Sequence, residues 1–491
     1  MQFRIGMDIG TTSTKAVLYD GVFAVRDSAA QTYPTIRAEE GMAEQDPKVI
    51  FKAVIAVLQT LLNRNEVIRN QIKSVSFSSA MHSLMLVSGD GKPLTNVYTW
   101  ADNRSNATLK LTREESDLNW IYQRTGTPIH SMSPLSKLLW LKKEHPVLLA
   151  KAERIVGIKE YITYQLTGEW KIDYSLASAT GLFNLKKLDW DQDILDFVGV
   201  NRKAFSDPVD TNFVFTRKVE ETYAKAALSL QTNLVIGASD GCLANLGLDA
   251  VGQNEVAMTI GTSGALRMVN DHIVLDPEGR TFCYYLAKDK WVVGGAVNNG
   301  GNAFEWIANI FSADYKSLNE MAGKISPGAD GLLFYPYLNG ERAPLWDASV
   351  QAHFIGIDAI HTKDHFVRAV MEGVLFNLAE VLDILETFGG QSKCLKVTGG
   401  FLHSSLWKQM AADIFNKTLT LSPQFESSCL GAVLVGEPYD AELLETLEAK
   451  EEEVVPDEMT SEKYKETFEL YQALSKPIKE MHAIREFYRK K

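Results

Sequence analysis

MDIGTTSTKAVLYD, residues 7–20, is the stretch of sequence that decides the fold. Apolar residues alternate with other types over residues 3–9, and an apolar run returns at 16–19. This pattern predicts a strand, a tight turn at 10–13 and a second strand. The turn combines glycine with hydroxyl residues, so its amides and hydroxyls can donate to a bound anion.

A shorter version of this stretch returns in the second half of the chain. Residues 7–11 read MDIGT and residues 258–262 read MTIGT, and small or hydroxyl residues follow in both places. Five similar residues can match by chance, so the echo alone does not establish a repeat. Two such turns, one near the start of each half, are what a duplicated domain would leave. We therefore predict two domains, 1–246 and 247–491, with the boundary between about 243 and 253.

The surrounding pattern is that of an α/β protein. Asp46 followed by Pro47 predicts the start of a helix that runs through Leu62. Residues 74–78 are typical of a strand, and residues 135–166 are mostly typical of helix. Alternating strands and helices favour an α/β fold.

The C-terminal part of the chain is predicted to be helical. Aromatic and apolar residues between 464 and 474 follow helical spacing, so this segment should dock on a core. Pro477 should kink or interrupt the helix. Residues 440–458 are acidic and poor in aromatics, which predicts an exposed linker or a surface helix.

Composition narrows the classes of function. The chain has 491 residues, of which 45% are apolar, and this suits two substantial domains with real cores. Its net charge of −12 disfavours nucleic acid as a partner, because phosphate backbones need a basic surface. No segment approaches the roughly eighteen uninterrupted apolar residues of a membrane span, and the N-terminus lacks a signal-peptide pattern.

The cysteines and histidines do not indicate a metal site. The four cysteines are scattered, at positions 242, 283, 394 and 429. A reduced, cytoplasmic protein is the simplest interpretation. His361 and His365 are four residues apart, but no HExxH surrounds them, so a solvated loop or helix end is preferred to a zinc site.

The first turn suits a site for phosphates and a metal ion. The hydroxyls of Thr11, Thr12 and Ser13 would donate to phosphate oxygens, and Lys15 would add positive charge. Asp8, at the end of the first strand, suits a ligand of Mg²⁺. Neither a Walker loop nor a Rossmann fingerprint occurs. The alternative is a plain hairpin with an exposed lysine, which would be preferred if this stretch stood alone.

The second turn would supply the opposite side of such a site through Gly261 and Thr262. Thr259 stands where the first turn has Asp8, so the carboxylate is kept in only one half. One metal ion needs only one anchor, and two carboxylates beside a triphosphate would repel each other. The asymmetry therefore favours chemistry over a purely structural repeat.

Asp240 is the candidate general base. It follows an apolar strand at 235–238 and precedes Gly241. A carboxylate at this place could accept the proton of a substrate hydroxyl that attacks the γ-phosphate of a nucleotide. The alternative role is the N-cap of a helix that begins near Cys242, and the residues alone favour the cap. The two roles are compatible.

Two polar clusters follow predicted strands in the first half. Met81 and His82 belong to one, and Asp102 and Arg104 belong to the other. Carboxylate and imidazole groups suit hydroxyls, and arginine suits a carboxylate, so the clusters could bind a polyol or a sugar acid. A buried ion pair with a core-packing tryptophan is an equal alternative. Lys159, on a predicted helix, would ordinarily be solvated.

Taken in order, these stretches resemble the FGGY family of carbohydrate kinases over about the whole chain. The motifs that carry the resemblance are DIGTTSTKAVL, WADNR, SDG, IGTSG, GERAP, TGG and a late Gly-Ala pair, at 8–18, 100–104, 239–241, 260–264, 340–344, 398–400 and 431–432. The resemblance implies an α/β fold of two ribonuclease-H-like domains of the actin-like ATPase type. It also implies ATP and Mg²⁺ in the cleft between them.

The resemblance also implies roles for single residues. Asp240 would be the catalytic base, and the metal would lie near Asp8. The implied phosphate contacts are Thr11, Thr12, Ser13, Lys15, Gly261 and Thr262. The implied lining of the nucleoside pocket is Gly301, Glu305, Gly400 and Ser404, where glycerol kinases carry a glutamine in place of Glu305 and an asparagine in place of Ser404. The N-terminal domain would then hold the sugar and the C-terminal domain the nucleotide.

Within the family, the sugar-facing motifs look most like those of the gluconate kinases. These motifs are SAMHSL, TWADNRS, RTGTPIH, GIKEYI and IDYSLASATG, at 79–84, 99–105, 124–130, 157–162 and 172–181. The implied reaction converts ATP and D-gluconate to ADP and 6-phospho-D-gluconate. The implied substrate contacts are Met81, His82, Asp102, Arg104 and Asp240.

Other functions stay open at this point. Xylulose kinases also carry the Met-His pair, so a xylulose or ribulose kinase is the alternative within the family. An actin-like or chaperone-type ATPase would share the two turns without transferring phosphate to a sugar. The expected partners are a small sugar or sugar acid and ATP, without nucleic acid or membrane, and a homodimer is the assembly to test.

Overall fold

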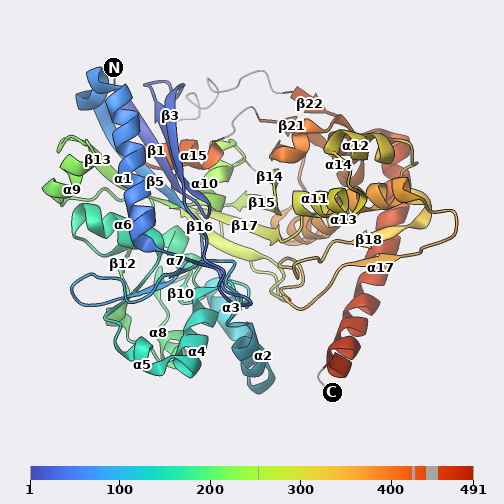
Figure 1. Cartoon of the computed structure of the whole chain (residues 1–491), viewed down its shortest axis with the longest axis horizontal. Helices are drawn as coiled ribbons and strands as arrows, with labels where there is room; N and C mark the ends of the chain where they lie inside the picture. Colours follow the sequence, from blue (N-terminus) through green and yellow to red (C-terminus); the bar gives the residue numbers. More distant parts are fainter. Residues whose placement is uncertain (1, 253, 423–425, 438–451, 490–491) are drawn as a thin grey trace. The chain divides into compact units, whose positions relative to one another are not determined.

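The computed structural model describes residues 2–252, 254–422, 426–437 and 452–489 (Figure 1). The chain divides into two compact units, each made of separate segments. The first unit consists of 1–251, 269–292 and 426–449, and the second of 252–268, 293–425 and 450–491.

The first unit is built on a five-stranded sheet in the order β13-β5-β1-β2-β3. Its strands are β1 (Phe3–Ile9), β2 (Ser13–Tyr19), β3 (Val25–Thr32), β5 (Ile72–Ser79) and β13 (Asn233–Ser239). β1 pairs antiparallel with β2 and parallel with β5, and β5 pairs parallel with β13. The predicted strand-turn-strand is confirmed, and the amide of Gly10 donates to the carbonyl of Ser13 at 3.0 Å to close the turn.

The second unit repeats this arrangement. Its strands are β14 (Glu255–Ile260), β15 (Gly264–Asn270), β17 (Lys290–Val297), β20 (Cys394–Thr398), β21 (Thr418–Leu421) and β22 (Glu452–Val454). With β16 (Phe282–Ala287) they form a seven-stranded sheet in the order β16-β17-β15-β14-β20-β21-β22. β14 pairs antiparallel with β15 and parallel with β20. The amide of Gly261 donates to the carbonyl of Ser263 at 2.9 Å, as Gly10 does in the first turn. The short echo in the sequence therefore corresponds to a repeated fold.

Helices cover both faces of the first sheet. On one face, α1 (Pro47–Arg64) and α6 (Ile158–Thr167) share a hydrophobic core with β1 and β5. The predicted start of α1 is confirmed, because the Asp46 side chain caps it by accepting from the amide of Lys48 at 2.8 Å. On the other face lie α10 (Asp240–Gly247) and α15 (Ser427–Val435). Figure 1 shows α15, in orange, beside the blue strands of the N-terminus.

The return of α15 to the first sheet depends on glycine. An added Cβ on Gly6 of β1 would lie 2.0 Å from the carbonyl oxygen of Cys429, and one on Gly431 would lie 2.0 Å from that of Leu243. Neither distance is compatible with a side chain. The absence of side chains at these two positions therefore lets β1, α10 and α15 approach backbone to backbone.

Shorter elements complete the first unit. Its remaining helices are α2 (Asn106–Glu115), α3 (Asn119–Thr125), α4 (Pro134–Glu144), α5 (Pro146–Ala150), α7 (Tyr174–Ser178), α8 (Gln192–Val198) and α9 (Glu220–Lys225). Short ladders join β4 (Glu44–Gln45) to β7 (Val97–Tyr98), β6 (Met85–Val87) to β8 (Arg154–Val156), β9 (Lys171–Asp173) to β12 (Asp207–Val209) and β10 (Phe183–Asn184) to β11 (Asp189–Trp190). The region 135–166, predicted as mostly helix, is helical except for β8 and the turns beside it.

The second unit carries its own helices. They are α11 (Gly301–Phe311), α12 (Tyr315–Gly323), α13 (Lys363–Gly389), α14 (Ser405–Phe415) and α17 (Glu458–Arg489). The predicted docking of the C-terminal helix is confirmed, because Tyr464 and Tyr471 of α17 are buried against Tyr335 and Phe376. The helix continues through Pro477, so the proline does not interrupt it.

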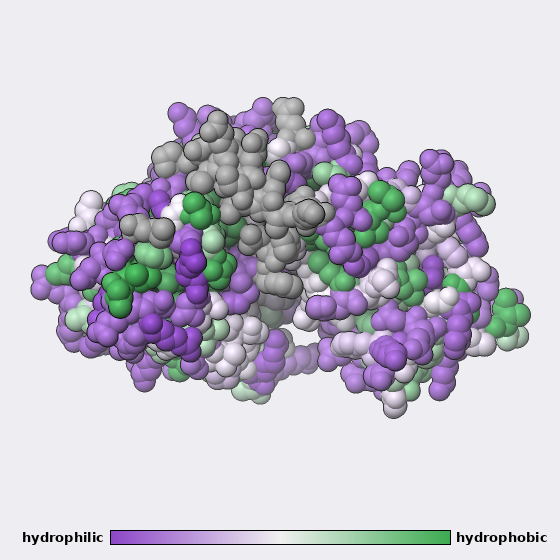
Figure 2. Space-filling view, turned by 90° about the horizontal axis from the view of Figure 1, so that it is seen from above, coloured by the Kyte–Doolittle hydropathy of each residue, from purple (hydrophilic) through white to green (hydrophobic). Residues whose placement is uncertain are grey.

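Two further expectations have a plain outcome. Of the predicted linker or surface helix at 440–458, residues 440–451 lie outside the described residues, whereas 452–454 form the strand β22. No helix among the residues described is both long and apolar enough to cross a membrane. On the face drawn in Figure 2, hydrophilic residues dominate and apolar ones are scattered between them.

Candidate active site

Two carboxylates and a serine meet at one edge of the first sheet. In the strand register, Asp8 on β1 lies opposite Ser78 on β5, and the next residue, Ser79, lies opposite Ser239 on β13. Asp240 follows directly as the first residue of α10. Because the carboxyl ends of parallel strands share one edge, the topology places Asp8 and Asp240 near each other. Ser78 Oγ donates to Asp8 Oδ1 at 2.6 Å.

At this edge of the sheet, a negative charge on Asp8 is unfavourable. Burial, and after it the carboxylate of Asp240, raise the pKa of Asp8 to about 7, although the hydrogen bond from Ser78 lowers it. A divalent cation beside Asp8 would relieve this cost. Within the described ranges, no cluster of three or more His, Cys, Asp or Glu side chains is arranged to hold a metal. Mg²⁺ is commonly held by one or two carboxylates together with phosphate oxygens, and Asp8 and Asp240 are two carboxylates at this edge.

Asp240 sits at the N-terminus of a helix but is not its cap. The N-cap position belongs to Ser239, one residue earlier, so the alternative that made Asp240 the cap is wrong by one position. Asp240 Oδ1 accepts a hydrogen bond of 2.7 Å from the amide of Gly241. This bond orients the carboxylate, which is the group that a general base needs.

Lys159 is buried, contrary to the expectation of a solvated lysine. Its Nζ lies 2.7 Å from Asp173 Oδ2 and donates to the carbonyl of Ala238 at 3.1 Å. Burial lowers the pKa of Lys159, and Asp173 opposes that shift. The lysine thus fixes the end of β13 two residues before Asp240. Its burial could not be predicted from helical spacing, because its partner Asp173 belongs to another element.

The first turn is held by side chains from outside it. Tyr33 donates through its hydroxyl to the carbonyl of Gly10 at 2.6 Å. Trp100 Nε1 donates to Thr11 Oγ1 at 2.9 Å, which ties the WADNR segment to the turn. The amide of Tyr33 donates to the carbonyl of Thr12 at 3.1 Å, and the carbonyl of Ser13 closes the turn itself.

Lys15 has a partner that sequence reasoning missed. It lies opposite Asp8 in the register of β1 and β2, and its Nζ forms an ion pair with Glu426. Glu426 directly precedes α15, so it reaches this site only because that helix returns to the first sheet. No local signal in the sequence could have found this pair.

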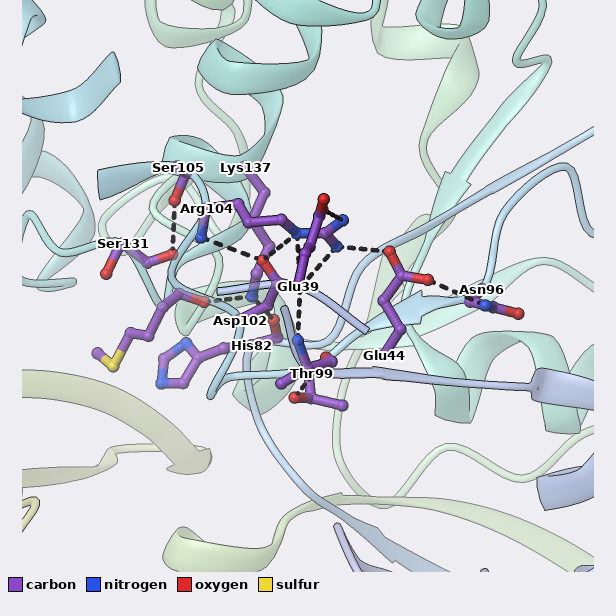
Figure 3. Close-up of polar contacts among 12 residues, drawn as sticks. Glu39, Glu44, His82, Asn96, Thr99, Asp102, Arg104, Ser105, Ser131 and Lys137 are labelled. Atoms are coloured by element: carbon purple, nitrogen blue, oxygen red, sulfur yellow. Dashed lines mark hydrogen bonds and ion pairs between the residues drawn. The ribbon is translucent and has the colours of Figure 1, made fainter. Parts of the chain in front are cut away.

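The second polar cluster is an ion-pair network around Arg104 (Figure 3). Its guanidinium lies 2.6 Å from Asp102 Oδ2, 2.5 Å from Glu44 Oε1 and 3.1 Å from Glu39 Oε1. It also lies over the ring of Trp140, 4.9 Å from the centroid. Asp102 and Glu44 raise the pKa of Arg104 although burial opposes the rise. These contacts are those of a buried ion pair, one of the two readings that the sequence left open.

The first polar cluster has an unusual backbone. His82 has φ +64°, a left-handed conformation that is strained for a residue with a side chain. Its Nδ1 donates to the carbonyl of Ala179 at 2.7 Å, which fixes the ring. The half-buried Met81 precedes it. The carbonyl of His82 accepts from Lys137 Nζ at 2.8 Å, and the carbonyl of Met132 accepts from the same nitrogen at 2.6 Å.

A cavity of about 820 Å³ in the second unit collects the remaining predicted residues. It lies among α11, α12 and α14, which are neighbours in Figure 1. The predicted residues that line it are Gly261, Thr262, Gly301, Glu305, Gly400 and Ser404. An added Cβ on Gly261 or Gly400 would meet no atom within 4 Å, so these two glycines leave open space for a ligand. A Cβ on Gly301 would lie 2.7 Å from the carbonyl oxygen of Gly261.

The walls of this cavity suit a nucleoside. Phe304, Tyr315, Phe401 and Trp407 line it with aromatic surface beside the polar side chains. Ser404 caps α14 by accepting from the amide of Trp407 at 3.0 Å, and its hydroxyl donates to Asn319 Oδ1. The aromatic residues were not predicted, although Phe304 stands next to the predicted Glu305. An apolar cavity with a few placed polar groups is the usual form of a small-molecule site.

Comparison with known proteins identifies the chain. Residues 3–247 match the N-terminal domain, and residues 256–437 the C-terminal domain, of the FGGY family of carbohydrate kinases. The chain belongs to this family. It is 44% identical to the gluconokinase of Bacillus subtilis (strain 168) over 447 residues, which cover 88% of this chain and 87% of that protein.

Solved structures of similar proteins have the same fold as this FGGY kinase over nearly its whole length. The gluconate kinase of Lactobacillus acidophilus matches with a TM-score of 0.91 and 34% identity, covering 97% of this chain and 98% of the other. A structure described as the ligand-bound xylulose kinase of the same organism matches with the same four values. The two-domain α/β fold of the actin-like ATPase type, predicted from the resemblance, is confirmed. Members of this family use ATP.

Proposed function

We propose that this FGGY kinase transfers the γ-phosphoryl group of ATP to D-gluconate and releases ADP and 6-phospho-D-gluconate. The observation that carries the proposal is the 44% identity to a gluconokinase over 88% of the chain. The strand-end carboxylate Asp240 and the nucleotide-sized cavity supply the groups that such a reaction needs.

We assign the nucleotide to the second domain and the sugar to the first, with the domains at 1–246 and 247–491. Gly261 and Thr262 would contact phosphate oxygens through their backbone, because a glycine-rich turn lets amides approach an anion. Gly301, Glu305, Gly400 and Ser404 would line the nucleoside side of the cavity. The proposed phosphate contacts of the first turn are Thr11, Thr12, Ser13 and Lys15.

Asp240 would accept the proton of the C6 hydroxyl as that oxygen attacks the γ-phosphorus. The bond from Gly241 orients the carboxylate at the start of α10. Lys159 holds the strand end in front of it through Ala238. General base catalysis of this kind contributes a rate factor of about 10² to 10⁴.

Asp8 would hold Mg²⁺, whose chemistry is to neutralise negative charge on the transferring phosphoryl group. The raised pKa of Asp8, about 7, supports this assignment, because a cation would favour the charged carboxylate that burial disfavours. Ser78 orients that carboxylate through its hydrogen bond of 2.6 Å.

The sugar would contact the polar clusters of the first domain. We assign Met81 and His82 to its hydroxyls, since the bond from His82 to Ala179 fixes the tautomer in which Nε2 of a neutral ring is an acceptor. Asp102 and Arg104 stay proposed contacts. Three carboxylates already surround Arg104, so a substrate carboxylate would have to displace one of them.

A coupled assay of ADP release tests the proposal. The enzyme with Mg-ATP would be given gluconate, xylulose, ribulose, glycerol or no sugar. Turnover that requires gluconate supports the proposal. Turnover with xylulose instead would favour the second candidate, which the matching xylulose kinase structure supports. Loss of ATP that ignores every sugar would favour an ATPase. A cytoplasmic location and a homodimer stay predictions.

A further inference from the structure

A second cavity lies in the first domain, away from the residues assigned to catalysis. It has a volume of about 780 Å³ and is open to solvent. It is formed where β9, β12 and the end of α6 come together with the segment at 202–205. The residues that line it are Arg154, Gly168, Glu169, Trp170, Lys171, Arg202, Lys203, Phe205, Asp207 and Arg217.

This cavity is basic in an acidic protein. Five cationic side chains line it against only two carboxylates, Glu169 and Asp207, although the whole chain carries a net charge of −12. The cations come from separate segments of the chain, so the fold brings them together. A concave surface with one sign of charge raises the local concentration of ligands of the opposite sign.

Part of this positive charge is not neutralised within the protein. Lys171 pairs with Asp207 at 3.2 Å, and Arg202 pairs with Asp189 at 3.2 Å. The side chains of Lys203 and Arg217 have no ion pair or hydrogen bond in the part of the chain that the structure describes. Two cations at the mouth of the cavity are therefore available to a ligand.

The other cationic side chain is held toward the same place. Arg154 Nη1 donates to the backbone carbonyl of Lys203 at 2.9 Å, which joins the start of β8 to the 202–205 segment. In the described part of the chain, no carboxylate forms an ion pair with Arg154, so its charge is not neutralised there. Its guanidinium can still bind a phosphate oxygen through the remaining N–H groups.

The cavity also has an aromatic wall. Trp170 stacks on Tyr164 with ring centroids 3.8 Å apart and planes 8° from parallel, and the buried Phe205 also lines the cavity. This rigid apolar surface next to the cations suits the carbon skeleton of a small organic anion. An inorganic ion alone would leave the aromatic surface unused.

We propose that this cavity binds the phosphate group of a small phosphorylated carbohydrate. Lys203, Arg217 and Arg154 would meet the phosphate, and Trp170 would lie against the carbon chain. The site is separate from the nucleotide cavity, which belongs to the second unit and shares no residue with it.

The position of the cavity connects it to the catalytic edge. β9 runs from Lys171, which lines the cavity, to Asp173, which pairs with Lys159 at 2.7 Å. Lys159 in turn donates to the carbonyl of Ala238, two residues before Asp240. We therefore expect occupancy of the cavity to change kcat. This part of the proposal rests on the proposed function, whereas binding does not.

Titration calorimetry of the full-length protein tests binding. Saturating Mg-ADP fills the nucleotide site first, and the titrants are glucose 6-phosphate, glucose and inorganic phosphate. We expect glucose 6-phosphate to bind, inorganic phosphate to bind more weakly and glucose not to bind. If neither glucose 6-phosphate nor inorganic phosphate binds at millimolar concentration, the proposal is overturned. Binding of inorganic phosphate as tight as that of the sugar phosphate would overturn the role of the aromatic wall.

Two matched double variants locate the site. Lys203→Gln with Arg217→Gln should weaken glucose 6-phosphate binding about tenfold or more, because two charge-assisted contacts are lost. Lys48→Gln with Lys52→Gln removes the same charge from the exposed side of α1 and should change binding less than about twofold. All four side chains are exposed, so these variants should fold, and their melting curves check this. Equal effects of the two double variants, or none of the first, would overturn the assignment.

A variant that removes a negative charge from the cavity should have the opposite effect on binding. Asp207→Asn removes the carboxylate that pairs with Lys171, so it should tighten binding of glucose 6-phosphate. Weaker binding by this variant would contradict the electrostatic argument. In the coupled assay, saturating glucose 6-phosphate should change the kcat of the natural enzyme. It should leave the kcat of the double variant, Lys203→Gln with Arg217→Gln, unchanged. An unchanged kcat in both, with binding intact, would overturn the connection to catalysis alone.

Discussion

Lys137 is buried, and among the residues that the structure describes no carboxylate lies at ion-pair distance from it. Its replacement by methionine is expected to remove one pH-dependent contribution to the free energy of unfolding. The side chain lies on α4 and donates to the carbonyls of His82 and Met132. Burial lowers the pKa of Lys137 to about 7, and the nearby Arg104 acts in the same direction while Asp102 opposes it. A methionine has a similar volume and no titrating group.

The expected magnitude follows from that pKa. In the unfolded chain a lysine keeps its proton up to a pH of about 10.4, whereas folded Lys137 loses it near pH 7. Between these values the unfolded state binds more protons, so the free energy of unfolding rises with pH, by about 1.4 kcal/mol per pH unit. From pH 6 to pH 9 the natural protein should gain about 3 kcal/mol from this group. The Lys137→Met variant should not.

Urea unfolding at pH 6 and pH 9 measures this difference. The variant should be less stable than the natural protein at pH 9, because two buried carbonyls lose their donor at about 1–3 kcal/mol each. At pH 6 the deficit should be smaller by about 3 kcal/mol. Lys143→Met, on the exposed side of the same helix, controls for removing one lysine. A deficit of the same size at both pH values would refute the reasoning.

Four further predictions concern the site. Asp240→Asn should lower kcat by about 10² to 10⁴ and leave the Kd of Mg-ADP unchanged, and near-normal turnover would remove the base assignment. Lys15→Ala should raise the apparent KM of ATP about tenfold and that of the sugar much less, so the reverse pattern in steady-state kinetics would contradict the phosphate role. The pKa of Asp8 is raised to about 7 in the folded protein, so the folded state binds this proton more tightly than the unfolded state does. The free energy of unfolding therefore falls as pH rises from about 4 to 7. Asp8→Asn should therefore stabilise the metal-free protein more at pH 8 than at pH 5 in thermal melts, and an equal effect at both would contradict this. Ser404→Ala removes the cap of α14, so it should cost about 1 kcal/mol of stability and raise the Kd of Mg-ADP, and an unchanged Kd would exclude Ser404 from the site.

Much of the local structure follows from short stretches of sequence. Alternation of apolar residues identified β1 and β2, and Asp46-Pro47 identified the start of α1. These features depend on neighbours a few residues away, such as the capping bond that the amide of Lys48 donates to the Asp46 side chain. Six residues that were predicted to bind the nucleotide also line a single cavity.

The buried charges could not be predicted in the same way. Lys159 was expected in solvent, and its partner Asp173 lies on a separate strand. Lys15 pairs with Glu426 across 411 residues of sequence. In both pairs the partner comes from another element, and burial of an ion is costly unless such a partner offsets it.

The sequence by itself determined the two glycine-hydroxyl turns, the strands that flank them and the presence of a carboxylate in only one of the two. Such features arise from backbone preferences and side-chain alternation, which act over a few residues. Only the tertiary structure decided that α15 returns to the first sheet, that Arg104 sits among three carboxylates and that a basic cavity forms in an acidic chain. Those outcomes depend on which distant surfaces exclude water together, and no short stretch of sequence contains that information.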